Sequence, residues 1–102
     1  MNITTDNTEN SVTIFRSLIA SLPFDRLDEA QLDDLSAIAA ESAEGLCQGL
    51  WYIGESLEEG TEDVQENIEQ ASAYLKASAH LIPALMAICE QSCHQLMRMK
   101  VD

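Results

Sequence analysis

Apolar residues between Ser11 and Pro23 recur at the spacing of one helix face. Ser11 can cap the start of such a helix, and Pro23 limits its end because the residue before a proline is pushed out of the α region. We predict a short helix over residues 12–22, with a β-strand as the alternative because the segment opens with β-branched residues. Residues 1–10 offer little to bury and are expected to form a disordered tail before a single domain over residues 11–102. The apolar residues of the predicted helix are Val12, Phe15, Leu18, Ile19 and Leu22.

The second predicted helix has the clearest start signal in the chain. Asp28 is followed three residues later by Gln31, so that side chain and backbone can cap each other. The pattern stops at Gly60, the residue type that most readily takes the left-handed conformation after a helix. We predict a helix over residues 28–59. Its apolar seam keeps nearly heptad spacing and contains Leu35, Ala39, Ser42, Leu46, Leu50, Ile53 and Leu57.

Thr61 follows the glycine at once as the N-cap of a third helix. A connection this short predicts that the two helices fold back on each other as an antiparallel hairpin. No residue just before Pro83 can cap a new helix, so we predict one helix over residues 62–100 with a kink at Pro83, and a chain reversal there is the alternative. The seam predicted for this helix contains Ile68, Leu75, Ala79, Ile82, Met86, Cys89, Cys93 and Leu96.

A hairpin alone cannot bury its apolar surface. Residues 81–89, LIPALMAIC, contain no polar side chain, and a helix that is apolar on every side must be buried on every side. Glycines within the second helix would let another backbone come close, or else they are tolerated weak positions. We therefore predict an all-α fold in which two hairpins form a homodimeric four-helix bundle. The residues assigned to the dimer interface are Leu81, Ile82, Leu85, Met86, Ile88, Gly45 and Gly49.

Composition narrows the possible functions of this chain. Its 102 residues fit one domain, and 18 acidic against 5 basic residues give a net charge of −13. That charge argues against direct binding to nucleic acid or to an anionic membrane surface. Four glycines and two prolines are too few for a β-sandwich, and we expect no membrane span. Three cysteines without a disulfide pattern favour a reducing compartment, and we predict the cytoplasm.

The negative charge is concentrated in the middle of the sequence. Residues 25–69 contain fourteen acids and one base, Arg26. Several of these acids lie at predicted helix N-termini, where the helix dipole favours them, but others crowd the tip of the predicted hairpin. The crowding is either a solubility device or a binding surface for a basic protein, with Trp51 and Tyr52 as flanking anchors or as rim packing. The predicted tip residues are Glu55, Glu58, Glu59, Glu62, Asp63, Glu66 and Glu69.

Motifs of catalysis are missing from the sequence, which has no HExxH, GxGxxG, P-loop or GxSxG. We therefore expect no enzyme and no cofactor. Cys89 and Cys93 are four residues apart and form a weak metal candidate, although packing explains them better. The leading prediction is a non-enzymatic interaction or regulatory protein that binds a basic protein. The alternatives are an inhibitor that mimics nucleic acid and a small metal or ligand carrier that uses the two cysteines.

Overall fold

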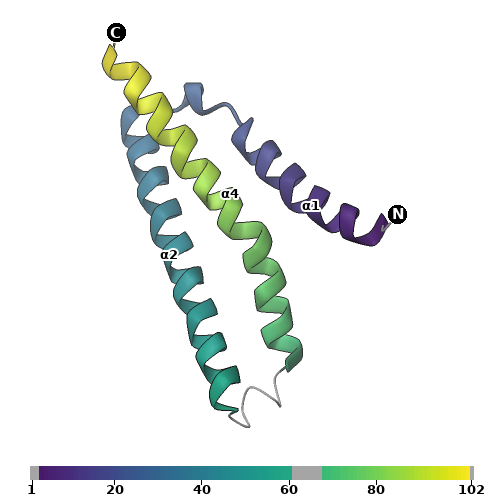
Figure 1. The fold of residues 1–102 in the computed structure, drawn as a ribbon. Coiled ribbons are helices and arrows are strands. Elements are labelled where there is room, and N and C mark those ends of the chain that lie inside the picture. The colour runs from purple at the N-terminus through teal and green to yellow at the C-terminus, as the bar shows by residue number, and fades with distance from the viewer. Residues whose placement is uncertain (1–2, 61–67, 102) are drawn as a thin grey trace.

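The structure, a computed structural model, describes the backbone of residues 3–60 and 68–101 and the side chains of residues 11–60 and 68–100. This part of the chain is all-α, as predicted, and it contains no strand (Figure 1). The elements are α1 (Ile3–Ala20), the 3-10 turn η1 (Phe24–Arg26), α2 (Glu29–Glu59) and α4 (Ile68–Val101).

Helix α1 is longer than the sequence pattern predicted. It begins at Ile3 instead of residue 12, so residues 3–10 of the expected tail are helical, and the β-strand alternative is wrong. Extending a helix from a turn that has already formed costs far less than nucleating one, so weakly helical residues can join it. The helix ends at Ala20, short of residue 22, in keeping with the restriction that Pro23 places on the residues before it.

The predicted ends of α2 are confirmed in detail. The Asp28 carboxylate accepts the Gln31 backbone N–H at 2.8 Å, and the Gln31 side-chain oxygen accepts the Asp28 N–H at 3.0 Å. Gly60 terminates the helix in the left-handed conformation, with φ 69° and ψ 35°. Its N–H donates to the carbonyls of Ser56 and Leu57, which would otherwise lack partners at the helix end.

Helix α4 runs without interruption through Pro83, so the alternative of a chain reversal there is wrong. Figure 1 shows the ribbon of α4 changing direction about half-way along. A proline inside a helix removes one backbone hydrogen bond and crowds the preceding turn, which accounts for the bend. The predicted N-cap Thr61 and the connection over residues 61–67 lie outside the described residues.

The three helices lie side by side in one layer (Figure 1). Helix α4 is central, with α2 antiparallel on one side and α1 with η1 on the other. The smallest extent of the molecule is 15 Å, close to the ~10–12 Å diameter of a single helix with its side chains. The radius of gyration is 17.2 Å, well above the ~13 Å of a compact domain of about 100 residues. The described part of the chain therefore encloses no thick core.

The buried part of the molecule is correspondingly small. Among the described side chains, the buried apolar residues are Phe24, Leu32, Ala39, Ala84 and Ala87. Three serines are also buried: Ser56 on α2, and Ser78 and Ser92 on α4. The hydroxyls of Ser78 and Ser92 have no hydrogen-bond partner. These two serines lie seven residues on either side of Leu85, so they share one face of α4.

The seam predicted for α4 is covered only in part: Cys89 and Cys93 contact Ser36 of α2. Three of its large residues, Ile68, Leu75 and Met86, are exposed, while the face with the two serines is buried. Spacing identifies residues that share a face, but it does not say which face another helix covers. Serine is small enough for a tight contact between helices, but because it is polar the sequence pattern predicts it on the surface.

Two side-chain contacts fix the neighbours of α4. The Tyr74 hydroxyl donates to the Leu46 carbonyl of α2 at 3.2 Å, and the Tyr74 ring occupies the space beside Gly49 where a side chain would be. On the other side, His80 lies 3.0 Å from the Ser11 hydroxyl and packs edge-on against Phe15 of α1. His80 therefore joins α1 to the centre of α4.

One helix of the described chain, α4, is long and apolar enough to cross a membrane by length and composition alone. Only 17% of the qualifying 18-residue window is buried inside the molecule. Soluble proteins contain helices that meet the same criterion, so this is weak evidence for a span. It does mark α4 as a helix with much apolar surface left uncovered.

Candidate functional site

The acidic residues predicted for binding gather where α2 ends and α4 begins. Glu58 and Glu59 are exposed on the last turn of α2, Glu55 is half-buried one turn earlier, and Glu69 is exposed on the first turn of α4. No basic residue lies in the last turn of α2. The remaining predicted residues, Glu62, Asp63 and Glu66, lie outside the described residues.

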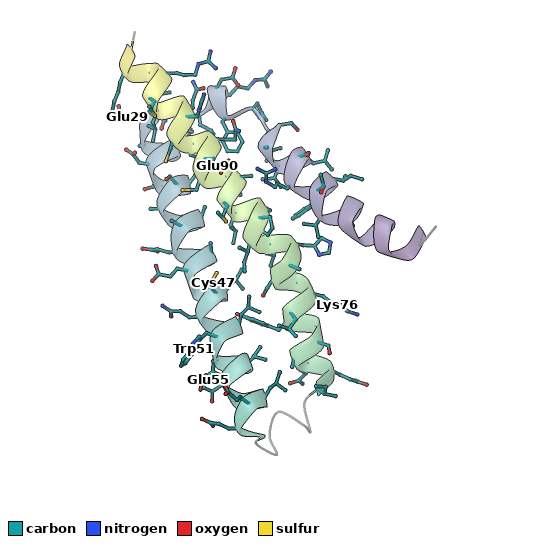
Figure 2. The ribbon with its side chains drawn as sticks, viewed as in Figure 1. Glu29, Cys47, Trp51, Glu55, Lys76 and Glu90 are labelled. Carbon is teal, nitrogen blue, oxygen red and sulfur yellow. The ribbon has the colours of Figure 1, made fainter. Side chains whose placement is uncertain are left out.

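Both predicted aromatic anchors are exposed to solvent. Trp51 is 68% exposed and Tyr52 is 69% exposed. Figure 2 shows Trp51 and Glu55 projecting from the side of α2 that points away from α4. The interior of the fold therefore does not require the Trp51 indole, so the alternative of rim packing inside this chain does not explain it.

Carboxylates lie before and after the exposed indole along the same side of α2. Glu44 lies seven residues before Trp51, and Glu55 and Glu58 lie four and seven residues after it, which places all four on one side of α2. Glu44 accepts a side-chain hydrogen bond from Gln48 at 3.5 Å. We call Glu44, Trp51, Glu55 and Glu58 the acidic–aromatic surface. The sequence reading found three of its members and missed Glu44, although the seven-residue spacing from Trp51 was visible.

This surface has the chemistry to hold a cation from another protein. A guanidinium or ammonium group over an indole face gains about 0.5–2 kcal/mol, depending on how far it is desolvated. Carboxylates beside the ring add charge-assisted hydrogen bonds and attract the cation over about 8 Å at physiological salt. The surface is therefore suited to binding a cationic side chain.

A second uncovered surface follows α4. Its members are separated by 7, 4, 3, 4, 7 and 4 residues, which keeps them on one face of the helix. We call it the α4 stripe: Ile68, Leu75, Ala79, Ile82, Met86, Cys93 and Met97. Its large members are exposed from 43% at Leu75 to 67% at Met97, apart from the half-buried Ile82. It corresponds closely to the seam that the sequence reading assigned to contacts within the hairpin.

The residues predicted for a dimer interface are divided between several environments. Leu81 and Met86 are 41% and 54% exposed, and the half-buried members are Ile82, Leu85 and Ile88. Gly45 has open space beside it. Gly49 has Tyr74 of the same chain as its close neighbour, so its small size is used within the chain. Association between two chains stays a prediction.

The cysteines do not form a three-ligand metal site in the described part of the chain. All three are free thiols. The Ser36 hydroxyl lies 3.4 Å from Cys93 Sγ and 3.7 Å from Cys89 Sγ, whereas Cys47 is exposed elsewhere on α2. Among the described residues no group of three or more histidine, cysteine or acidic side chains could hold a metal ion.

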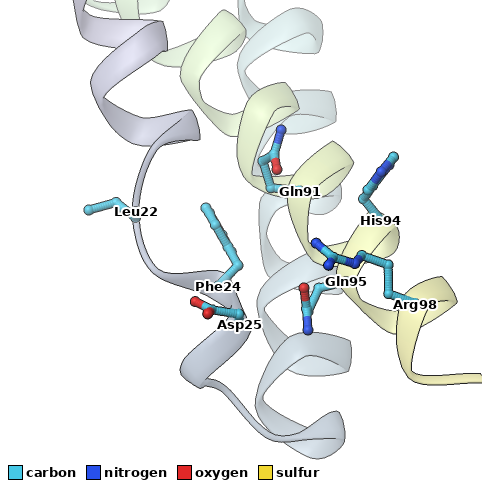
Figure 3. A pocket seen from close by; sticks show the side chains of 7 residues that line it. All are labelled: Leu22, Phe24, Asp25, Gln91, His94, Gln95 and Arg98. Atoms are coloured by element: carbon cyan, nitrogen blue, oxygen red, sulfur yellow. The ribbon is translucent and has the colours of Figure 1, made fainter. Parts of the chain in front are cut away.

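A small pocket that no sequence pattern indicated lies where η1 meets α4. Its volume is about 250 Å³, below the ~300–1,000 Å³ of most ligand sites. Figure 3 shows Phe24 and Asp25 on one side of it and the side chains of α4 on the other. Only Phe24 is buried among its lining residues, so no desolvated polar group is aimed at a ligand. The residues that line it are Leu22, Phe24, Asp25, Gln91, His94, Gln95 and Arg98.

The acidic–aromatic surface and the α4 stripe are two features of the described residues that have no evident role inside the chain. The first presents charge around a large ring, and the second presents apolar side chains in a line. Both are suited to contacts with other macromolecules. No family model, curated protein or solved structure matches this chain.

Proposed function

We propose that this protein is a non-enzymatic interaction protein that binds a basic segment of another protein through the acidic–aromatic surface. The observation that carries the proposal is Trp51, which is 68% exposed and lies in a row with three glutamates on the same side of α2. A large exposed ring is costly in water, and aromatic residues are enriched at protein interfaces. A partner arginine or lysine would cover the ring and pair with the carboxylates at the same time.

The electrostatics of the whole chain support the same proposal. A net charge of −13 attracts basic partners and accelerates their encounter at low salt. The last turn of α2 has no base to neutralise its glutamates, and these lie at the end of the helix where the dipole disfavours negative charge. A basic partner would relieve that repulsion.

We also propose that α2 and α4 form a hairpin and that two copies associate as a four-helix bundle. Support comes from the antiparallel packing of the two helices and from the one-layer shape, which leaves thirteen large hydrophobic side chains exposed among the described residues. A second copy that covered part of that surface would give the assembly the two layers of secondary structure that ordinary domains have. The three free thiols suit a reducing compartment such as the cytoplasm.

Charge reversal tests the binding surface. The variant that changes Glu55, Glu58 and Glu59 to lysine is immobilised beside the wild type, and proteins captured from a cell lysate are identified by mass spectrometry. We expect the specific partners of the wild type to be lost. Replacement of Trp51 by alanine, which leaves the charge unchanged, is expected to weaken capture of the same partners.

A matched control separates this surface from net charge in general. Changing Asp33, Asp34 and Glu41 to lysine alters the net charge by the same amount on exposed positions nearer the start of α2. We expect this control to keep the captured partners. Equal loss in both variants would contradict a defined surface, and unchanged capture by the first variant would contradict the proposal. Competition with DNA then separates an ordinary binder from a nucleic-acid mimic, because only the mimic occupies a DNA site.

A further inference from the structure

We infer that the α4 stripe is the surface on which a second copy of this chain packs, with the two α4 helices antiparallel about a two-fold axis near Ile82 and Pro83. The inference rests on the proposed self-association and specifies its surface, its orientation and one ion pair. The partner is the same chain because the charges beside the stripe, and four of its seven members, complement themselves when the helix is reversed.

The stripe and the adjoining side of α2 together provide enough surface for a stable dimer. From Ile68 to Met97 it is about 44 Å long at ~1.5 Å per residue. Together with the adjoining side of α2, about two helix diameters wide, it presents about 900 Å², close to the ~800 Å² that each partner contributes to a standard interface. The middle of the stripe, around Ile82 and Met86, has no charged residue between Lys76 and Glu90.

Reversal about the centre of the stripe brings four of its seven members onto one another. Ile68 and Met97 are equally far from the midpoint between Ile82 and Pro83, and so are Ala79 and Met86. In an antiparallel pair, Ile68 therefore faces Met97 of the partner subunit, and the small Ala79 faces the larger Met86 of the partner subunit. An isologous contact requires this self-complementarity.

The charges beside the stripe favour the same orientation. Lys76 and Glu90 lie seven residues on either side of Pro83, share one side of α4, and are both exposed. Figure 2 shows Lys76 on the side of α4 away from α2. Reversal therefore places Lys76 beside Glu90 of the partner subunit, twice per dimer. A parallel pair would instead leave Lys76 and Glu90 of the partner subunit about 21 Å apart along the axis, at ~1.5 Å per residue, so the ion pair could not form.

The ends of the helices add to this complementarity. The last turn of α4 contains Arg98 and Lys100, and its first turn contains Glu69. In the antiparallel pair the basic end of one copy lies over the acidic end of the other. In a parallel pair the acidic ends of both copies would meet, and a chain with a net charge of −13 would repel its own copy most strongly there.

The face is tested by a charge at its centre. Met86→Glu places two carboxylates in the proposed contact, and since Met86 is 54% exposed the fold of one chain tolerates the change. The matched control is Ile38→Glu at a 59% exposed position. Ser36 of α2 contacts Cys93, a member of the stripe, and Cys47 lies on the same side of α2 as Ser36. Ile38 lies half a helical turn away from Cys47, on the opposite side of α2.

Dissociation constants are measured by sedimentation for the full chain, with circular dichroism as a check on folding. We expect Met86→Glu to weaken the dimer at least a hundredfold and Ile38→Glu to change it less than threefold. A dimer lost with Ile38→Glu and kept with Met86→Glu would overturn the stripe as the contact while leaving self-association intact. A wild type that stays monomeric at 100 µM would overturn the inference and assign the stripe to a different occupant. Neither result bears on the acidic–aromatic surface, whose test is capture of a basic partner.

Orientation is tested by a charge swap. Each single variant, Lys76→Glu or Glu90→Lys, places like charges together twice per dimer. We expect each to weaken the dimer roughly tenfold, because the dimer loses two exposed ion pairs worth ~0.2–1 kcal/mol each. The double variant restores the pair in reversed order and should return the dissociation constant to within threefold of the wild type. Failure of the double variant to recover would overturn the antiparallel arrangement.

Discussion

Replacement of Gly49 by alanine isolates the contact that sets the distance between α2 and α4. Alanine favours the interior of a helix by ~1 kcal/mol over glycine. At Gly49, however, its methyl group would collide with the Tyr74 hydroxyl and lie 2.8 Å from Cζ of that ring. Displacing the ring forfeits the hydrogen bond to Leu46, worth ~0.5–1.5 kcal/mol, and overpacks a tight contact at ~1–3 kcal/mol. We expect Gly49→Ala to lower the free energy of unfolding by about 1–3 kcal/mol.

The same substitution at Gly45 is the control. A Cβ there meets nothing within 4 Å, and its backbone has no positive φ, so Gly45→Ala should raise the free energy of unfolding by about 0.5–1 kcal/mol. Urea unfolding followed by circular dichroism measures both variants at one protein concentration. In a background with Tyr74→Ala the penalty at Gly49 should disappear. Equal stabilisation by the two alanines would refute a close contact between Gly49 and Tyr74.

Three further changes test other parts of the fold. Asp28→Ala removes the confirmed cap of α2 and should cost about 1 kcal/mol of unfolding free energy in the same urea assay, and an unchanged midpoint would contradict the capping role. Ser92→Ala removes a buried hydroxyl that has no partner and should stabilise the chain by about 1 kcal/mol; a loss of stability would show that the hydroxyl is bonded. His80→Ala removes the contact with Ser11 and should speed amide hydrogen exchange in α1 but not in α2, so equal rates in α1 would contradict its anchoring role.

Local signals in the sequence predicted the helix ends well. The capping box at Asp28 and the left-handed Gly60 depend on residues within four positions of each other, so no tertiary information was needed. Continuity through Pro83 was also predictable, since nothing before it can start a new helix. The start of α1 was missed because helix extension into weakly helical residues depends on the turn already formed beyond them.

The faces of α4 could not be assigned from spacing. Ser78 and Ser92 are buried on one face of α4, and large apolar residues on another face are left exposed. In the sequence both faces of α4 recur with similar periodicity. Which face packs against a neighbouring helix depends on the volume of the side chains where the two helices come closest, as the fit of Tyr74 beside Gly49 shows. At the candidate site, the exposure of Trp51 could not be predicted from the sequence, because it depends on how the helices pack. The positions of the glutamates along the same side of α2 could be predicted from their spacing.

The mass of the wild-type protein in solution tests the central claim most directly. A single chain has a mass of 11.2 kDa. Sedimentation equilibrium across a hundredfold range of concentration should give twice that mass at the upper end, because a second copy covers the apolar face that one layer of helices leaves open. A mass that remains at one chain throughout the range, with the helix content unchanged, would contradict the claim.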